Sequence, residues 1–416
     1  MNIYKINDKK FKGIYLSLNF LMQADKRIIS SNSVLTSMIS KDTKEYGNRR
    51  DIKKYMASLY GASFSANVEK YGDLENIEFR IECINPKLIN EKEDIVDKCI
   101  TFLKSMVFNT NINEIDFNEE LFEREKITML EKISARKDEK LKYGVNRMEE
   151  IMCNNTGFGT FLYGDEEAVK SLNKKDIIKA YDNLINNSVG TFIISGNLDG
   201  YLNIDEKISE KFNMYNSNLS YKDLVYNIHQ DEVEDENVYE KCDSTQSVMA
   251  AGIKIKDVDK EDMYALNVYN AILGSTPSSK LFQIFRERES LAYTARSRFY
   301  RFKDMIIIYA GIEAKNYEKG KKVILNILQD IKDLNITDEE FEAAKQSLIS
   351  DLSEWNDSKV MMAKSLYTDL ITYFKATNSI EDMKSKIGKV SLNDIKDVAN
   401  RIELKVWYLL GGEENV

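Results

Sequence analysis

The sequence predicts an α+β protein made of two homologous units, each a mostly antiparallel sheet packed with helices. Short segments in which apolar and polar residues alternate indicate strands with one buried face. Longer segments with apolar residues three or four positions apart indicate amphipathic helices. The order of these segments in the first half of the chain returns in the second half, which indicates a duplicated unit.

The clearest strand of the first half is 77–83, where apolar residues alternate with charged ones. This period of two is typical of a strand with one buried and one solvated face. The other elements that the periodicity predicts in this half are, in order, a strand at Ile14–Phe20, a helix at Arg50–Leu59, a strand at Phe64–Val68, helices at Lys92–Met106, Phe117–Met152 and Lys175–Ile185, and a strand at Gly190–Gly196.

The second half repeats this plan from a strand at Ser247–Ile255 onward. The elements that follow are predicted to be helices at Met263–Leu273 and Ser279–Arg288, strands at Thr294–Arg301 and Met305–Glu313, a helix around Val323–Ile331, helices within Asp338–Thr377, a helix starting near Ser391 and a strand at Val406–Gly412.

Short sequence matches support the duplication. The segment 119–123 resembles 339–342, and Ser-Leu-Asn at 171–173 returns at 391–393, in both cases about 220 residues later. Their shared offset and order predict a repeated unit of about 200 residues. We therefore expect a first unit at 1–212, a polar linker at 213–231 and a second unit at 232–416.

Composition excludes several classes of function. The chain has 416 residues and a formal charge of −9, which argues against broad binding of nucleic acid or anionic membranes. The longest apolar run, Met305–Ile312, is far shorter than the roughly 20 residues that span a bilayer, and the N-terminus lacks the apolar segment of a signal peptide. We therefore expect a cytoplasmic protein. Four widely spaced cysteines without a C-x-x-C pair indicate reduced core thiols.

Histidine is the most restrictive residue type. The chain has one, His229, in the expected linker, so every two-histidine zinc site is excluded. No G-x-S-x-G motif or reactive-cysteine signature accompanies it, and His229 is not expected to be catalytic. No P-loop or G-x-G-x-x-G motif indicates a nucleotide site.

The segment Gly274–Tyr293 carries the most informative motif. Its S-K-L-F, R-E and L-A-Y elements resemble the second-domain signature of the pitrilysin/insulinase family of zinc peptidases. The resemblance implies paired α+β units that form half of a clam-shell. In that family an arginine and a tyrosine seven residues apart help to hold substrate opposite the zinc, and Arg286 and Tyr293 match them. Forked guanidinium donors and a phenol hydroxyl suit a scissile carbonyl, so we expect both residues to bind substrate.

The first unit departs from this family. Active members carry H-x-x-E-H on the first long helix, with two histidine ligands and a glutamate base. When Lys41-Asp-Thr43 is aligned with the family's K-G-T, the histidine positions fall on Ser33 and Ser37. The glutamate position falls on Thr36, which cannot act as a carboxylate base. Hydroxyl groups are poor zinc ligands, so the motif is degenerate.

A third zinc ligand of the family is a glutamate further along the chain. The segment 125–133 resembles the family's E-R-x-x-x-x-E-E-I helix, which places Lys132 at the ligand position. A shift of one residue would place Glu131 there but would restore no histidine. We therefore expect no metal, no cofactor and no catalytic residue in this chain.

The resemblance implies a division of labour between two chains. In heterodimeric members of the family, one subunit carries the zinc and the other supplies the arginine and tyrosine. We therefore expect a non-catalytic subunit that binds peptide beside a homologous zinc-bearing partner, with strand addition to a sheet edge as one mode of peptide binding. An inert structural or peptide-binding scaffold is the alternative, a self-sufficient peptidase is a third hypothesis, and homodimerisation is left open.

Two further segments resemble one bacterial branch of the family. They are Leu59–Ser63 and Lys142–Arg147. The resemblance implies an association with aminopentanol modification of elongation factor P. The peptide substrate, its length and the identity of the partner are not visible in these residues.

Overall fold

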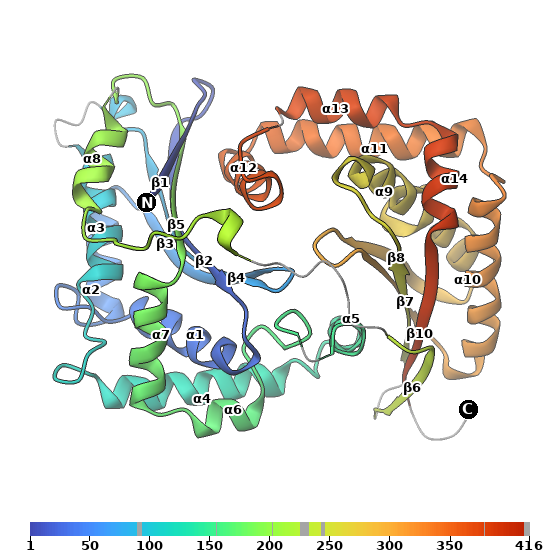
Figure 1. Ribbon diagram of the computed structural model, residues 1–416, viewed down its shortest axis with the longest axis horizontal. Coiled ribbons are helices and arrows are strands. Elements are labelled where there is room, and N and C mark those ends of the chain that lie inside the picture. Colours follow the sequence, from blue (N-terminus) through green and yellow to red (C-terminus); the bar gives the residue numbers. More distant parts are fainter. Residues whose placement is uncertain are drawn as a thin grey trace. The chain divides into compact units, whose positions relative to one another are not determined.

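The computed structural model describes residues 1–89, 94–154, 156–201, 203–224, 233–242, 246–377 and 379–411. Their contacts divide the chain into two compact units (Figure 1). The first unit consists of 1–134, 155–226 and 355–377, and the second of 135–154, 227–354 and 378–416. His229 and Gly412 lie outside the described residues. The domain boundaries expected from the sequence repeat stay a prediction.

The first unit is built on a five-stranded sheet in the order β1-β5-β2-β4-β3. β1 and β5 are parallel, and every other neighbouring pair is antiparallel. The strands are β1 (Asn2–Asn7), β2 (Gly13–Gln23), β3 (Ser63–Tyr71), β4 (Leu74–Ile84) and β5 (Val189–Gly196).

The second unit repeats the same sheet. Its order is β6-β10-β7-β9-β8, again with one parallel pair, β6 and β10. The strands are β6 (Glu236–Lys241), β7 (Ser247–Ile255), β8 (Ala292–Tyr300), β9 (Met305–Ile312) and β10 (Ile402–Gly411). The identical strand order agrees with the duplication that the sequence predicts, and the α+β fold class is confirmed.

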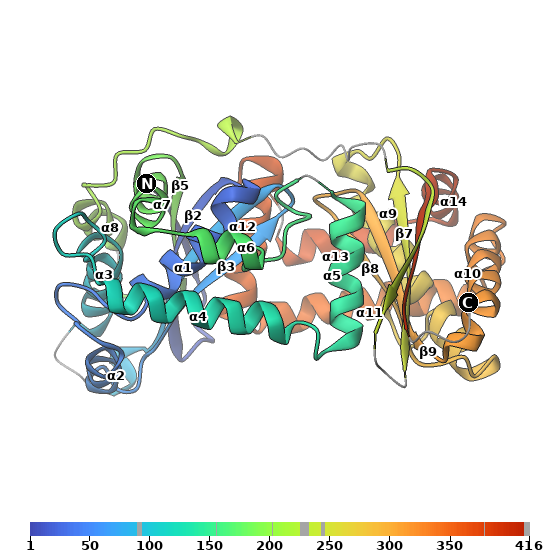
Figure 2. The same cartoon turned by 90° about the horizontal axis from the view of Figure 1, so that it is seen from below.

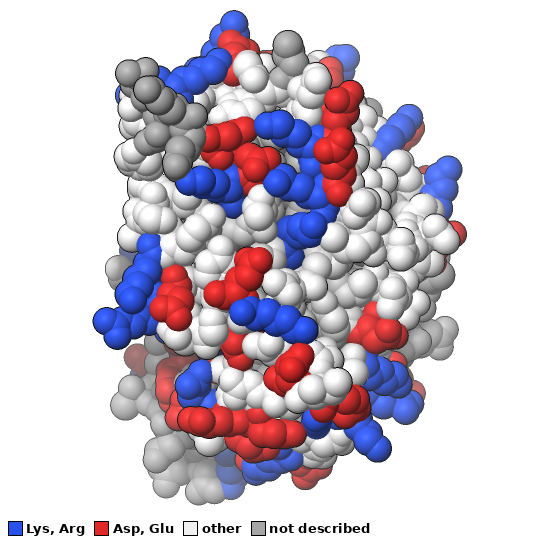
Figure 3. Space-filling view, turned by 90° about the vertical axis from the view of Figure 1, so that its left-hand side faces the viewer, with Lys and Arg blue, Asp and Glu red and all other residues white. Residues whose placement is uncertain are grey.

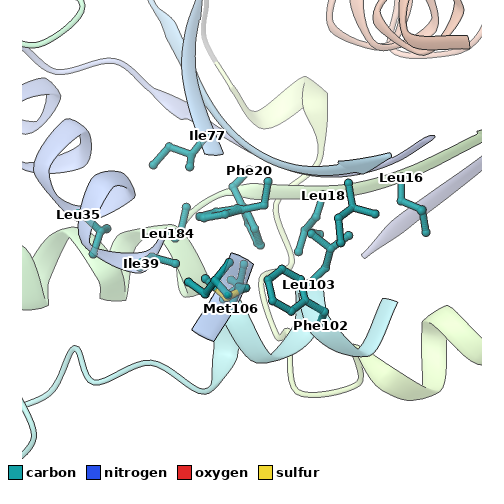
Figure 4. Packing of buried hydrophobic residues seen from close by; sticks show 14 of the residues in the cluster. Leu16, Leu18, Phe20, Leu35, Ile39, Ile77, Phe102, Leu103, Met106 and Leu184 are labelled. Atoms are coloured by element: carbon teal, nitrogen blue, oxygen red, sulfur yellow. The ribbon is translucent and has the colours of Figure 1, made fainter. Parts of the chain in front are cut away.

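Helices cover one face of the first sheet and bury its apolar side chains. Leu16, Leu18 and Phe20 of β2 pack against helix side chains such as Leu103 and Met106 (Figure 4). The helices of this unit are α1 (Lys26–Ile39), α2 (Arg49–Ser58), α3 (Ile95–Phe108), α4 (Glu119–Ala135), α6 (Glu166–Ser171), α7 (Lys174–Asn186), α8 (Ile204–Lys211) and α12 (Lys359–Tyr373), with 3-10 turns η1 (Pro86–Leu88) and η2 (Tyr221–Asp223).

The second unit has an equivalent apolar core between its sheet and its helices. The helices are α5 (Lys140–Met152), α9 (Met263–Asn270), α10 (Tyr317–Lys332), α11 (Asp338–Asn356), α13 (Ile380–Lys389) and α14 (Leu392–Asn400), with π-helical segments η4 (Ala271–Ser275) and η5 (Leu281–Arg288) and 3-10 turns η3 (Lys260–Asp262) and η6 (Ala314–Asn316). Within the described residues, no helix has both the length and the apolar character that crossing a bilayer requires.

Each unit contains one helix from the opposite half of the sequence. α12 packs on the first sheet, where the Tyr367 hydroxyl donates to Asn76 Oδ1 at 2.8 Å. α5 packs on β7, β9 and β10 of the second sheet (Figure 2), and the Tyr300 hydroxyl donates to Glu149 Oε1 of α5 at 2.6 Å. These helices cover the sheet face opposite the main core, so both faces of each sheet are partly buried.

The predicted helix Phe117–Met152 is in fact two helices, α4 and α5, which belong to different units. The chain leaves the helix at Arg136–Glu139, a fully polar stretch that offers no apolar anchor to either core. The amide of Asp138 bonds to the carbonyl of Ala135 at 3.0 Å and closes α4. Periodicity did not reveal this break because the stretch contains neither proline nor glycine.

Candidate functional site

The degenerate metal motif lies on α1, as the alignment predicts. An Asp25 side chain caps this helix at its N-terminus, and most of its side chains are buried. The hydroxyl of Ser33 donates to the Leu162 carbonyl at 2.9 Å, and that of Thr36 donates to the Asn32 carbonyl at 2.7 Å. Ser37 donates to Glu125 Oε2 at 2.7 Å. All three hydroxyls already hold protein partners, so none is left to approach a metal ion.

A lysine supplies the positive charge at this site. The carboxylate of Glu125 on α4 is 1% exposed and forms an ion pair with Lys41, which follows α1 and is 23% exposed. A buried carboxylate needs a nearby cation or several donors, and the Lys41 ammonium and the Ser37 hydroxyl provide them. The ammonium thus compensates a charge that a metal ion would compensate in a zinc site.

Lys132, at the third ligand position, lies two helical turns after Glu125 on α4. Its ammonium lies 4.6 Å from the centre of the Tyr163 ring. Burial, with a contribution from the nearby positive charge of Lys41, lowers the pKa of Lys132. Glu131 beside it is exposed. Among the described residues, no group of three histidine, cysteine or acidic side chains is placed to hold a metal ion. The residues at this site therefore do not fit a zinc ion.

Sequence reasoning identified the lost ligands but not the ion pair between Lys41 and Glu125. The alignment with the family uses Lys41 and Glu125 to place the motifs, and it does not pair the two residues with each other. Glu125 and Lys132 are seven residues apart and therefore share a face of α4, but no pattern in the sequence pairs Glu125 with Lys41.

A second buried acid lies beside the middle of α1. Glu75 of β4 accepts a hydrogen bond from Asn32 Nδ2 at 2.5 Å, while Glu75 Oε1 and Asn32 Oδ1 are buried without a partner. Burial raises the pKa of Glu75 to about 7, against the opposing effect of the Asn32 hydrogen bond and the positive charge of Lys70. A proton on Glu75 would supply the donor that this pair lacks.

This acid predicts a pH-dependent stability. Because the pKa of Glu75 is raised from 4.5 to about 7 in the folded chain, its stabilisation is complete below about pH 4.5 and is lost as the pH rises through 7. The loss amounts to about 3 kcal/mol, at about 1.4 kcal/mol per pKa unit. Glu75→Gln, which keeps the shape and supplies a donor, should raise the free energy of unfolding at pH 8 by up to that amount.

Denaturation by urea at pH 5 and pH 8 checks this prediction. Wild type should lose stability between the two values, and Glu75→Gln should lose about 3 kcal/mol less. Glu45→Gln, at an exposed acid of the same unit, serves as the control. A Glu75→Gln variant that follows the wild-type pH profile would contradict the assignment.

The predicted substrate-binding residues lie together in the second unit. Arg286 is on η5, and Tyr293 is at the start of β8. The guanidinium carbon of Arg286 lies 4.8 Å from the centre of the Tyr293 ring and 4.7 Å from that of Phe282. Cation–π contacts with two rings hold the guanidinium in place. The seven-residue spacing thus brings the two side chains into contact.

The pair is accessible from solvent. Tyr293 is 78% exposed, and Arg286 is half-buried between the two rings. Within the described part of the chain, no carboxylate pairs with Arg286, so its N–H groups remain available as donors. The pairing of β8 with β9 shifts between Ala292 and Ala295, and this irregularity includes Tyr293. Such bulges re-aim side chains at sheet edges.

Comparison with known proteins finds similarity to one family of peptidases. Residues 171–348 match the family described as the peptidase M16 inactive domain. The chain is 26% identical to YmfF of Bacillus subtilis strain 168, a probable inactive metalloprotease, over 98% of this chain and 95% of that protein. It is 24% identical to YmxG of the same strain, an uncharacterized zinc protease, over 77% of this chain and 75% of that protein.

A solved structure has the same fold. The crystal structure of a conserved protein from Enterococcus faecalis V583 superimposes with a TM-score of 0.88 at 23% identity, over 100% of this chain and 97% of that chain. The chain is therefore similar to M16 metalloproteases, and over nearly its whole length to one that is described as probably inactive. This confirms the resemblance to the pitrilysin/insulinase family and agrees with the prediction that the chain is not a peptidase by itself.

Proposed function

We propose that this M16 metalloprotease homologue is the non-catalytic subunit of a heterodimeric zinc peptidase. Arg286 and Tyr293 hold the peptide, and a homologous partner supplies the H-x-x-E-H site. The observation that supports this most is the contrast between the two units. In the first unit, where the family has metal ligands, Lys41 forms an ion pair with the buried carboxylate of Glu125. In the second unit, the Arg286 guanidinium contacts two aromatic rings, is accessible and pairs with no described carboxylate.

The chemistry of the pair suits a peptide carbonyl. Arg286 can donate two parallel hydrogen bonds, and the rings of Phe282 and Tyr293 fix the plane of its guanidinium. The Tyr293 hydroxyl adds a donor from an exposed position. Donors fixed before the substrate binds stabilise a developing oxyanion by about 2.7–4 kcal/mol each. Strand addition to a sheet edge would fix the remaining backbone of the peptide.

Reconstitution with a zinc-bearing homologue tests the proposal. The partner should be a chain of the same family that carries H-x-x-E-H, co-expressed and purified together with this one. Peptide hydrolysis should require both chains, and elemental analysis should find about one zinc per heterodimer and none in this chain alone.

Three outcomes would argue against the proposal. Stoichiometric zinc and hydrolysis in the single chain would make it a self-sufficient peptidase. Failure to form a complex, together with full activity of the partner alone, would favour an inert scaffold. A homodimer that excludes the partner would do the same. The association with elongation factor P modification stays a separate prediction.

A further inference from the structure

Arginine is concentrated at one edge of the second sheet. Five of the chain's 13 arginines fall within 286–301, whereas the rest of the second half relies almost entirely on lysine. The five are Arg286, Arg288, Arg296, Arg298 and Arg301. Only two acids, Glu287 and Glu289, fall in the same segment, and Glu289 pairs with Lys319 at 2.8 Å. An acidic protein thus carries a local excess of positive charge.

Three of these five guanidinium groups, those of Arg286, Arg298 and Arg301, contact aromatic rings. Arg298 lies 4.9 Å from the centre of the Tyr300 ring and Arg301 lies 6.0 Å from that of Phe302, while Arg286 lies between Phe282 and Tyr293. No carboxylate among the described residues lies within ion-pair distance of any of the five.

The surface of the first unit can be compared with this segment. On the side of the first unit shown in Figure 3, basic and acidic side chains are interspersed. In the first unit, ion pairs join Lys207 to Asp94 at 3.0 Å and Lys211 to Asp97 at 3.2 Å. What distinguishes the five arginines of the second unit is that they fall within 16 residues that contain only two acids.

The arginines lie along β8 and in the segments next to it. No described strand pairs with the outer edge of β8. β8 is the last strand of its sheet, after β9. Arg296 and Arg298 alternate along β8 with the buried residues Ala295 and Ser297, so both point to the face opposite the core. An edge strand presents N–H and C=O groups that can pair with another extended chain.

We propose that the β8 edge binds an acidic peptide in extended conformation, by strand addition, with its carboxylates on the arginines. The inference rests on the proposed function, because it names the class of peptide that Arg286 and Tyr293 would hold. Guanidinium forks match carboxylates with two parallel hydrogen bonds. A strand with acidic residues at alternate positions would place them over Arg296 and Arg298, which are two residues apart.

A fluorescence anisotropy titration of the isolated chain tests this proposal without a partner. The probes are three labelled 12-residue peptides of the same β-forming backbone, with glutamate, glutamine or lysine at alternate positions. The glutamate peptide should bind at least about tenfold more tightly than the glutamine peptide, and binding should weaken with salt. The lysine peptide should not bind measurably.

Two matched double variants distinguish binding at the β8 edge from an effect of the net charge of the chain. Arg296→Gln/Arg298→Gln should weaken the binding of the glutamate peptide about tenfold or more. Arg49→Gln/Arg50→Gln, which removes the same charge at exposed positions of α2, should leave it unchanged. N-methylation of alternate backbone amides in one register should abolish binding and in the other should spare it, as strand addition requires.

Several results would overturn the inference. Equal affinity for the glutamate and lysine peptides would remove charge selection. If both double variants lose the same affinity for the glutamate peptide, net charge rather than the β8 edge accounts for binding. Displacement of the peptide by a single-stranded oligonucleotide at lower concentration would favour nucleic acid as the ligand. If the peptide binds as expected but no zinc-bearing partner gives hydrolysis, the proposed function fails while this inference stands.

Discussion

Arg286→Ala is expected to lower kcat/KM of the reconstituted heterodimer about a hundredfold. The substitution removes the forked donor that faces the scissile carbonyl, and the loss of one preorganised donor costs about 2.7–4 kcal/mol. An interaction made only in the transition state should lower kcat rather than raise KM. Steady-state kinetics with a fluorogenic peptide measures both constants. Full activity of Arg286→Ala would defeat the site assignment.

Variants at Tyr293 separate the roles of its ring and its hydroxyl. Tyr293→Phe keeps the ring against the Arg286 guanidinium and removes only a donor, so its loss should be smaller than that of Arg286→Ala. Tyr293→Ala also removes one of the two rings that hold the guanidinium, so its loss should approach that of Arg286→Ala. Lys322→Ala, at an exposed cation of α10 in the same unit, should retain wild-type activity.

The sequence predicts those parts of the fold that depend on local pattern. The alternation at 77–83 lies in β4, and Ser247–Ile255 is β7 with identical bounds. β1 and β6 were not predicted, because they are parallel outer strands with partly solvated side chains and little apolar alternation. The exchange of α5 and α12 between the units was also not visible, because helical periodicity does not specify which sheet a helix covers.

For the candidate site, too, the sequence predicts residues of local motifs but not contacts between distant segments. Ser33, Thr36 and Ser37 could be identified from the motif, because the alignment needs only neighbouring residues. Lys41 and Glu125 are 84 residues apart, and in a chain with 68 acids and 59 basic residues no pattern selects that pair. Arg286 and Tyr293 could be predicted as a pair because their spacing is fixed by family resemblance. Their mutual stacking required the turn from η5 into β8.

Lys41→Met is expected to destabilise the first unit by about 3 kcal/mol. The substitution keeps the length of the side chain but leaves the Glu125 carboxylate buried, with the Ser37 hydroxyl at 2.7 Å and the exposed Arg124 guanidinium at 3.5 Å as its remaining partners. Removing one partner of a buried ion pair costs about 3–5 kcal/mol, because the other charge stays uncompensated. The partial exposure of Lys41 and the remaining contact of Glu125 with Arg124 place the expected value at the lower end. Hydrogen exchange of α1 and α4 in increasing urea measures it locally.

The double variant Lys41→Met/Glu125→Gln decides whether charge is the cause. It removes both charges, and the glutamine oxygen can still accept from Ser37, so stability should return to within about 1 kcal/mol of wild type. Lys170→Met breaks the exposed pair of Lys170 with Glu166 and should cost only about 0.2–1 kcal/mol. If Lys41→Met costs no more than Lys170→Met, the lysine does not hold this site. If the double variant stays as unstable as Lys41→Met, packing rather than the uncompensated carboxylate accounts for the loss.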